Sequence, residues 1–236
     1  MVGIFFHLYF FNYIFLHVFF FYTTFAAKKK ENNMNDMVNY VVHSYIIPPI
    51  CGVFIQDIKG NLWKTEEWDG SVKPNAIAVI ADKAKFLIAL TQPSLMPISS
   101  GFGDSLEGYM TAIPSSEAAE ADDDGEGNTA RIMEMQPSTE YAAGYCNAFT
   151  FPDGKTRGYL PSLGQLRLAY QNKAAIATAL SKCGGTAMNT SCYYWSSTFW
   201  GVNCSHRLCW LLYWSDGNVY YGSLFFGRCV RPFANF

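Results

Sequence analysis

The apolar residues in the first half of the chain fall in short runs that are separated by turn-forming residues. Residues 52–58 and the pair Leu62-Trp63 flank a Lys-Gly-Asn turn, which predicts a β-hairpin. Two further short strands are predicted at residues 76–81 and 85–90. The stretch 91–127 holds Ser, Gly and Pro clusters and an acidic run, so we expect it to be mostly loop.

Helix signals follow this loop-rich stretch. We expect Asn128 to cap a short helix that runs to Met135. Ser162 is followed three residues later by Gln165, and this is the capping-box pair that opens a helix. Another helical segment is predicted at residues 172–180, where it ends before a Gly-Gly pair.

Strand patterns return in the carboxy-terminal part of the chain. We predict strands at residues 193–197, 209–214, 219–226 and 229–233. The Asp-Gly turn within residues 215–218 separates two apolar runs and is a strong hairpin signal. These patterns predict an α+β fold with two short helices plus antiparallel strands and a β-rich amino-terminal extension.

Length and charge restrict the possible organisation and partners. The 236 residues are enough for one large domain, or for a small amino-terminal piece and a second domain. We divide the chain into residues 1–36, a β-rich part at 37–127 and a carboxy-terminal domain at 128–236. The net charge of −2 and the scattered Lys and Arg residues give no reason to expect nucleic acid as a partner.

The first 25 residues are rich in phenylalanine and allow three interpretations. The segment is long enough to cross a bilayer, and Lys28, Lys29 and Lys30 after it favour an anchor with its amino terminus outside. It can also be a secretory signal. Such a signal would be atypical, because no basic residue precedes the apolar run. The third interpretation is a spurious extension, translated from upstream AT-rich DNA, with Met34 or Met37 as the real start. A membrane is a partner only if residues 1–25 are genuine.

The cysteines and histidines do not suggest a metal site. None of the seven cysteines has C-x-x-C spacing, and His43 and His206 are the only histidines outside the Phe-rich segment. We therefore expect no metal and no cofactor. Cys183 and Cys192 flank a Gly-Gly loop, and they either form a disulfide or remain two unpaired, partly buried thiols.

Four residue types disappear near the end of the chain. Lys, Glu, Gln and Met make up 33 of residues 1–194, or 17%, and are absent from the 42 residues 195–236. Codons of the form NNC or NNT cannot encode these residues or Trp, and randomising the adenines of Asn codons generates such codons. The alternative is that a β-rich segment of low charge simply has a skewed composition. On the first interpretation the tryptophans belong to the framework: Trp195, Trp200, Trp210 and Trp214.

Several motifs in this order resemble one protein family. They are Gly158-Tyr-Leu-Pro-Ser-Leu-Gly-Gln-Leu, Ala169-Tyr-Gln-Asn-Lys, Tyr194-Trp-Ser-Ser-Thr, Trp210-x-x-x-Trp-Ser-Asp-Gly and Val230-Arg-Pro-Phe. This run is similar to the variable proteins of diversity-generating retroelements, of the type found in gut phages and Bacteroidales. The match covers about residues 144–236. Residues 52–128 also look similar. Trp214 is a mild departure, because the relatives more often carry Phe there.

The resemblance implies a C-type lectin-like fold whose carboxy-terminal region, about residues 194–236, is varied by an error-prone reverse transcriptase. It implies ligand-binding, variable positions and no catalytic residue. These positions are Phe199, Gly201, Val202, Asn203, Cys204, Ser205, His206, Arg207, Leu208, Leu211, Tyr213, Asn218, Tyr220, Tyr221, Ser223, Leu224, Phe225, Phe226 and Arg228. The framework residues between them are Trp195, Ser196, Ser197, Trp210, Leu212, Trp214, Asp216, Gly217, Val230, Arg231 and Pro232.

Strand geometry agrees with this division. Alternate side chains of a strand face opposite sides, so Trp210, Leu212 and Trp214 share one face, and Leu211 and Tyr213 share the other. The framework residues fall on the first face and the variable ones on the second. We therefore expect substantial exposure for Leu211, Tyr213, Tyr220, Tyr221, Leu224, Phe225 and Phe226.

The sequence gives less support to two other functions. A formylglycine-generating-type oxidase shares the lectin-like architecture but needs reactive or copper-binding cysteines, and Cys204 and Cys209 are ordinary outcomes of NNC randomisation. A calcium-dependent sugar site needs clustered oxygens, which residues 122–128 supply. However, no Glu-Pro-Asn or Trp-Asn-Asp element accompanies them, so we expect a solvated acidic loop.

We therefore expect a protein that binds a macromolecular receptor, protein or glycan, on a cell surface. The expected location is a phage tail fibre in the virion, where a homo-oligomer would raise avidity. A bacterial surface adhesin of the same fold is the alternative, and a genuine leader at residues 1–25 would favour it.

Overall fold

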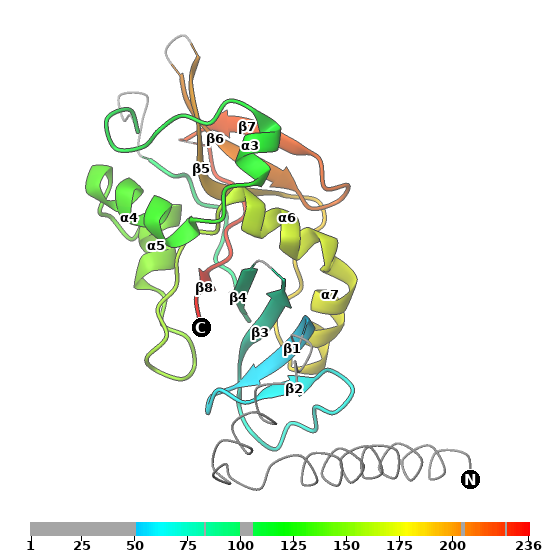
Figure 1. Ribbon diagram of the computed structural model, residues 1–236. Helices are drawn as coiled ribbons and strands as arrows, with labels where there is room; N and C mark the ends of the chain where they lie inside the picture. Colours follow the sequence, from blue (N-terminus) through cyan, green and yellow to red (C-terminus); the bar gives the residue numbers. More distant parts are fainter. Residues whose placement is uncertain (1–50, 83, 100–105, 204–205, 225) are drawn as a thin grey trace, which may run out of the picture. The chain divides into compact units, whose positions relative to one another are not determined.

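The computed structural model describes residues 51–236, with gaps at 83, 100–105, 204–205 and 225 (Figure 1). The Phe-rich segment and the predicted boundary at 36/37 lie outside the described residues. The helices are α3 (Ser116–Glu120), α4 (Gly125–Met135), α5 (Ala142–Ala148), α6 (Leu163–Gln171) and α7 (Lys173–Lys182). The strands are β1 (Gly52–Asp57), β2 (Leu62–Lys64), β3 (Pro74–Ala81), β4 (Ala84–Ala89), β5 (Tyr193–Asn203), β6 (His206–Tyr213), β7 (Val219–Ser223) and β8 (Phe233–Ala234).

One sheet contains five strands in the order β2-β1-β3-β4-β8, and all its pairings are antiparallel. The predicted hairpin is confirmed, because Ile55 of β1 pairs with Trp63 of β2. The last strand of the chain, β8, pairs with β4, so the first and the last described strands belong to the same sheet, with β3 and β4 between them. The described residues from 51 to 236 belong to one compact unit.

The second sheet contains β5, β6 and β7, and it is also antiparallel. The turn between β6 and β7 follows the Asp-Gly signal. Gly217 there has a φ of +78°, and a Cβ on it would lie 2.3 Å from the Tyr170 ring, so both the backbone and the space require glycine. The mixed α+β class with antiparallel sheets is thus confirmed.

The helix at Ser162 forms as the sequence predicts. Ser162 and Gln165 make both hydrogen bonds of the capping box at the start of α6, and α7 follows after Asn172. The predicted cap of α4 is wrong, because Asp124 caps it and Asn128 lies inside the helix. The acidic run is not simply loop either, since it holds α3 and the start of α4.

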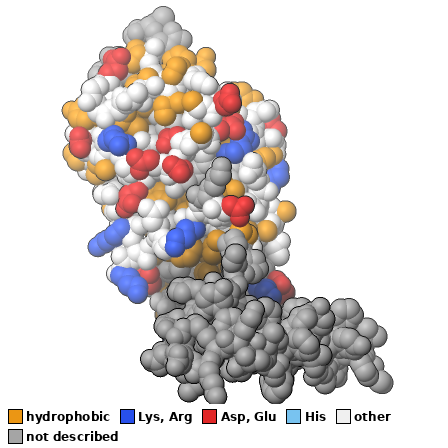
Figure 2. Space-filling model, viewed as in Figure 1, with side chains coloured by type: hydrophobic (Ala, Val, Ile, Leu, Met, Phe, Trp, Pro, Cys, Tyr) orange, Lys and Arg blue, Asp and Glu red, His pale blue; other side chains and the backbone are white. Residues whose placement is uncertain are grey.

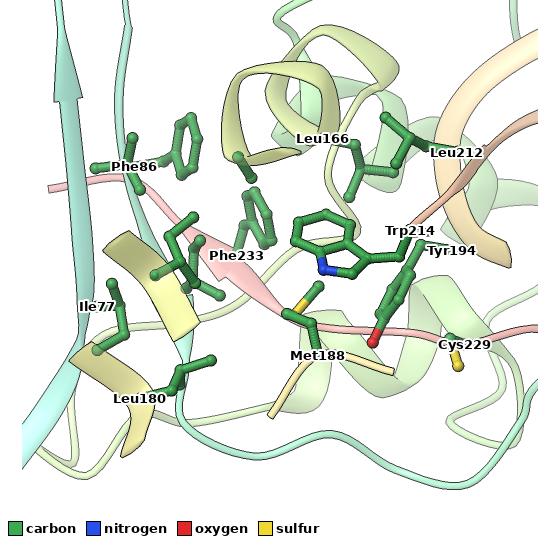
Figure 3. Close-up of a cluster of buried hydrophobic side chains, with 14 of the residues drawn as sticks. Ile77, Phe86, Leu166, Leu180, Met188, Tyr194, Leu212, Trp214, Cys229 and Phe233 are labelled. Carbon is green, nitrogen blue, oxygen red and sulfur yellow. The ribbon is translucent and has the colours of Figure 1, made fainter. Parts of the chain in front are cut away.

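The two larger of three groups of buried side chains in the described chain hold the sheets and helices together. The central core lies between the two sheets and α6 and α7, and it includes Ile77, Phe86, Leu166, Leu180, Tyr194, Leu212, Trp214 and Phe233 (Figure 3). The second core includes Ile98, Leu106, Ile132, Cys146, Leu160, Trp195, Phe199, Cys209, Leu211, Leu224 and Val230. The sheet of β5, β6 and β7 separates these cores and contributes side chains to both.

Among the described residues, no helix is long and apolar enough to cross a membrane. The disulfide joins Cys192 to Cys229. The pairing of Cys183 with Cys192 is therefore wrong, and Cys183 is a free, partly buried thiol. The sequence did not indicate Cys229 as the partner, because the antiparallel strands β5, β6 and β7 lie between the two cysteines and only their pairing brings Cys229 next to Cys192.

Candidate ligand-binding face

Strand β6 is covered on both faces. Trp210, Leu212 and Trp214 belong to the central core, whereas Cys209 and Leu211 belong to the second core. The predicted alternation is therefore present, but it separates two interiors. The expected exposure of Leu211 is wrong, because only 3% of its surface is accessible. The physical reason is that α4, α5 and the segment around Ile98 and Leu106 pack over this face.

Other predicted ligand-binding residues are also buried. Leu224 is 2% exposed, against expectation, and its carbonyl accepts hydrogen bonds from the backbone N–H groups of Ile98 and Ser99. The remaining buried members are Phe199, Gly201, Leu208 and Ser223. These residues therefore offer little accessible surface to a ligand.

The exposed members lie at the edge of the sheet and beyond it. Tyr220 is 41% exposed, Tyr221 50% and Phe226 49%, and Asn218 is also exposed. Val202, Tyr213 and Arg228 are half-buried. Cys204, Ser205 and Phe225, and the side chains of Asn203, His206 and Arg207, lie outside what the structure describes.

The predicted framework residues lie mostly inside the protein. Trp195, Ser196, Ser197, Trp210, Leu212, Trp214, Gly217, Val230, Arg231 and Pro232 are all buried. Asp216 is exposed, but its carboxylate accepts hydrogen bonds from the backbone N–H and the side-chain amide of Asn218 and so shapes the turn. The stretch from Tyr193 therefore combines a buried scaffold with a smaller exposed set than the sequence predicted.

The exposed set includes one cluster, which we call the aromatic–arginine patch and define as Tyr193, Tyr213, Tyr220, Phe226 and Arg228. The rings of Tyr193 and Tyr213 are stacked with centroids 4.6 Å apart, and Tyr220 meets Tyr193 edge-on at 5.3 Å. The guanidinium of Arg228 lies 5.8 Å from the Tyr193 ring centroid and 5.5 Å from that of Phe226. Rings and cation thus form one contiguous surface.

The backbone beside the patch is tied by paired hydrogen bonds. Met96 and Arg228 form an antiparallel bridge, with both N–H to carbonyl distances between 2.9 and 3.0 Å. Leu95, next to Met96, lies against Gly227 and is 59% exposed. Leu95 is therefore an apolar neighbour of the patch. Figure 2 shows hydrophobic side chains at the surface in the upper part of the view, where Figure 1 places β5, β6 and β7.

The disulfide holds the two sides of the patch together. Cys192 precedes Tyr193 and Cys229 follows Arg228, so the bond joins the neighbours of both residues. Cys229 N–H also donates to the Tyr193 carbonyl at 2.9 Å, and Trp195 N–H donates to the Cys229 carbonyl at 3.0 Å. Neither Tyr193 nor Leu95 was among the predicted site residues. The cross-strand pairing of Tyr193 with Tyr213 is the signal that could have identified Tyr193.

A second aromatic group lies on the opposite face of β7. Tyr221 stacks on Trp200 with centroids 4.6 Å apart and meets Trp210 edge-on at 6.1 Å. Because Tyr220 and Tyr221 are adjacent in a strand, they point to opposite sides of the sheet. The exposed aromatic residues of β7 therefore form two separate surfaces along one edge strand.

No family model, curated protein or solved structure matches this chain. The function must therefore be argued from the residues and their geometry alone.

The patch is rich in hydrogen-bond donors and poor in negative charge. The three ion pairs of the described residues are Lys64–Glu67, Arg131–Asp124 and Arg167–Glu120, and none involves Arg228. Arg228 Nη1 donates to the Gly227 carbonyl at 3.2 Å, and its buried Nε has no hydrogen-bond partner among the described residues. Residues 195–236 carry three arginines and one aspartate, a net charge of +2, in a chain whose net charge is −2. The patch is suited to an anionic group.

The cysteines that the structure describes do not form a reactive pair. Burial raises the pKa of the Cys209 thiol well above its ordinary value, and burial does the same at Cys146. Since the thiolate is the nucleophile, neither residue is set up for covalent chemistry. Cys192 and Cys229 are joined in the disulfide.

The acidic run is used within the fold. The Asp122 carboxylate accepts hydrogen bonds from the Thr198 hydroxyl at 2.6 Å and the Asn128 amide at 2.8 Å. Asp124 caps α4 and pairs with Arg131 at 3.2 Å. Among the described residues, no group of three or more His, Cys, Asp or Glu residues is placed to hold a metal ion. The Asp122 carboxylate thus links α4 to β5, and the Asp124 carboxylate stabilises the start of α4.

Proposed function

We propose that this chain is a ligand-binding protein that recognises a macromolecular receptor, protein or glycan, on a cell surface. In this proposal it has a C-type lectin-like fold and is displayed on a phage tail fibre, and its carboxy-terminal face is diversified by a retroelement. The observation that carries the proposal is the aromatic–arginine patch, whose exposed and half-buried side chains lie at the surface of a disulfide-tied sheet, four of its five residues within the compositionally skewed stretch.

The chemistry of the patch supports recognition. Tyr and Arg dominate the energetics of many interfaces, because aromatic side chains supply a large contact area at a small cost in conformational entropy. The ring stacking between Tyr193 and Tyr213 further restricts these side chains before a ligand binds. Tyr220 lies on β7, which pairs with β6 over five residue pairs. The patch is therefore largely preorganised.

The pattern of burial supports diversification. The exposed residues Tyr220, Tyr221 and Phe226 and the half-buried residues Tyr213 and Arg228 are all of types that NNC or NNT codons encode. The tryptophans, which such codons cannot encode, are buried or half-buried. The predicted variable residues that are buried, such as Leu208 and Leu211, are mostly apolar, as a core position requires.

Two selections test the binding role. The wild-type protein is used to select ligands from a library of random peptides and from a carbohydrate array. Affinity for the selected ligands is then measured with Tyr220→Ser and Phe226→Ser, with Leu62→Ser as the matched control, because Leu62 is an exposed apolar residue on β2 in the other sheet. The proposal predicts a loss of at least about tenfold for each patch variant and no loss for the control. Unchanged affinity in both patch variants, or no ligand from either source, contradicts it.

The neighbouring DNA tests the diversification. The proposal predicts a reverse-transcriptase gene and a near-copy of the 3′ coding region that differs from it only at adenines. A locus without these elements contradicts the retroelement mechanism. The binding role is tested independently by the ligand selections.

A further inference from the structure

Arg228 is a cation without an acidic partner among the described residues. Its guanidinium is half-buried between the rings of Tyr193 and Phe226, at 5.8 and 5.5 Å from their centroids. The Gly227 carbonyl accepts from Nη1, but no carboxylate of the described residues forms an ion pair with it. A planar guanidinium held on aromatic faces keeps its N–H donors in a fixed direction and suits a carboxylate ligand.

The other polar groups of the patch reinforce this preference. Tyr193, Tyr213 and Tyr220 contribute hydroxyl groups, and the patch contains no carboxylate or amide side chain. A hydroxyl can donate to a carboxylate oxygen and stays neutral, so it adds to the anion preference without opposing charge. Sugar hydroxyls, in contrast, need strong acceptors as well as donors, and the patch offers few of these.

The apolar part of the patch fits a side chain of a protein. Phe226 and its neighbour Leu95 are each about half exposed or more, at 49% and 59%. Leu95 lies against Gly227, and Met96, next to it, is bridged to Arg228, so apolar surface borders the cation. Burying such a surface favours a partner with an aliphatic or aromatic group close to its anionic group.

We propose that the patch binds a protein segment that presents an Asp or Glu carboxylate beside an apolar side chain. The carboxylate accepts hydrogen bonds from Arg228, and the apolar side chain packs on Phe226 and Leu95. This inference rests on the proposed function, because it names the chemistry of the ligand for the same face.

The peptide selection described above also tests this inference. Selected peptides should be enriched in an acidic residue next to an apolar one. Each is then made with Gln in place of its Glu, or Asn in place of its Asp, and measured against Arg228→Gln, Arg228→Lys and Arg157→Gln. Arg157→Gln is the matched control, because Arg157 is an exposed arginine on a different loop. Thermal unfolding of every variant verifies that it is folded.

The expected result is a loss of about tenfold or more with Arg228→Gln, a smaller loss with Arg228→Lys and no loss with Arg157→Gln. Amidating the peptide should produce the same loss on the wild-type protein and little further loss on Arg228→Gln, since both changes remove one contact. Selected peptides without acidic residues, a change within about twofold for Arg228→Gln, or binding to acidic glycans alone would overturn the inference.

The two proposals fail in different ways. If Tyr220→Ser and Phe226→Ser abolish binding while Arg228→Gln does not, the face binds ligands and the carboxylate assignment is wrong. If all three variants bind as the wild type does, the ligand site lies elsewhere and both proposals are wrong.

Discussion

Arg228 lies over the ring of Tyr193, with its guanidinium carbon 5.8 Å from the ring centroid, and a disulfide joins the residues next to both. Tyr193 begins β5 and Arg228 follows β7, so the two residues are far apart in sequence. The backbone segments that carry them are nevertheless joined by the disulfide and by hydrogen bonds. Two side chains far apart in sequence are thus fixed as neighbours before any ligand arrives. The disulfide contributes to the shape of the patch as well as to the stability of the fold.

Removing the disulfide tests this dual role. The double variant Cys192→Ser/Cys229→Ser should lower the free energy of unfolding by about 2–4 kcal/mol, because the cross-link restricts the unfolded chain. It should also weaken ligand binding by roughly fivefold, since ordering the patch then opposes association. Chemical denaturation and titration with a selected ligand measure the two effects. Cys51→Ser is the control and should change neither quantity, because Cys51 is a free, exposed thiol directly before β1.

Exchanging a scaffold residue should affect stability far more than exchanging a face residue. Trp195 is buried in the second core and its indole N–H donates to the Met96 carbonyl at 2.9 Å. Trp195→Ala should therefore cost about 3–5 kcal/mol of unfolding free energy. Tyr220→Ala, on the exposed edge strand, should cost less than about 1 kcal/mol. Similar losses for both variants in urea denaturation would show that the division into scaffold and face is wrong.

Replacing the buried Arg231 should also lower the free energy of unfolding. It is 1% exposed, and its guanidinium donates to the carbonyls of Ala89 and Thr186 at 2.7 Å and to the Gln92 side chain at 3.0 Å. Arg231→Met removes these hydrogen bonds to buried carbonyls, although the Gln92 side chain still accepts from the Tyr194 hydroxyl, and we expect a loss of roughly 2–4 kcal/mol. Arg157→Met, at the surface, provides the comparison in the same denaturation experiment. A stabilised Arg231→Met variant would show that the desolvation of the guanidinium outweighs its hydrogen bonds.

The lowered pKa of Asp57 should make the folded protein less stable in acid. Desolvation alone would raise its pKa, but the hydrogen bonds from Trp63, Asn61 and Lys59 outweigh it and lower the pKa from 3.8 to about 2. Because the folded pKa is depressed, this stabilisation is complete above about pH 4 and is lost as the pH falls through 2. Unfolding curves recorded across this window should show a steeper loss for the wild type than for Asp57→Asn. Parallel curves for the two proteins would contradict the assignment.

The sequence predicted the local elements better than their surroundings. The hairpin at residues 52–64 and the capping box of Ser162 depend on neighbouring residues, and both formed as expected. Helix α5 was missed, because its short sequence has no side-chain cap and gains its stability from packing in the second core. The link between Cys192 and Cys229 was missed for a similar reason, since tertiary contacts bring the two residues together.

The predicted face was partly wrong for a reason that periodicity cannot reveal. Alternation assigns Leu211 to the side opposite Trp210, and it does lie there. Alternation does not say what covers that side. In this protein α4, α5 and the loop around Ile98 cover it, so exposure depends on how close a residue lies to the strand end or the sheet edge. Tyr220 and Tyr221 on the edge strand β7 meet this condition, whereas Leu211 on the central strand β6 does not. Leu224 follows the same edge strand but is buried because it packs with Ile98 in the second core.

We propose that the stretch from Tyr193 carries a surface that can vary on a scaffold that cannot. Two libraries displayed on yeast and treated with protease distinguish the two sets of positions. In the first, NNC codons replace those of the exposed or half-buried residues Tyr213, Tyr220, Tyr221, Phe226 and Arg228. In the second, they replace those of the buried residues Phe199, Leu208, Leu211, Ser223 and Leu224, which the sequence also predicted to vary.

If the exposed positions can vary freely, more than about half of the first library should resist protease as the wild type does. Fewer than roughly one member in ten of the second should do so, because several simultaneous core changes exceed the stability of an ordinary domain. Equal fractions of resistant members, or a first library that is mostly cleaved, would contradict the existence of a variable face on a fixed scaffold.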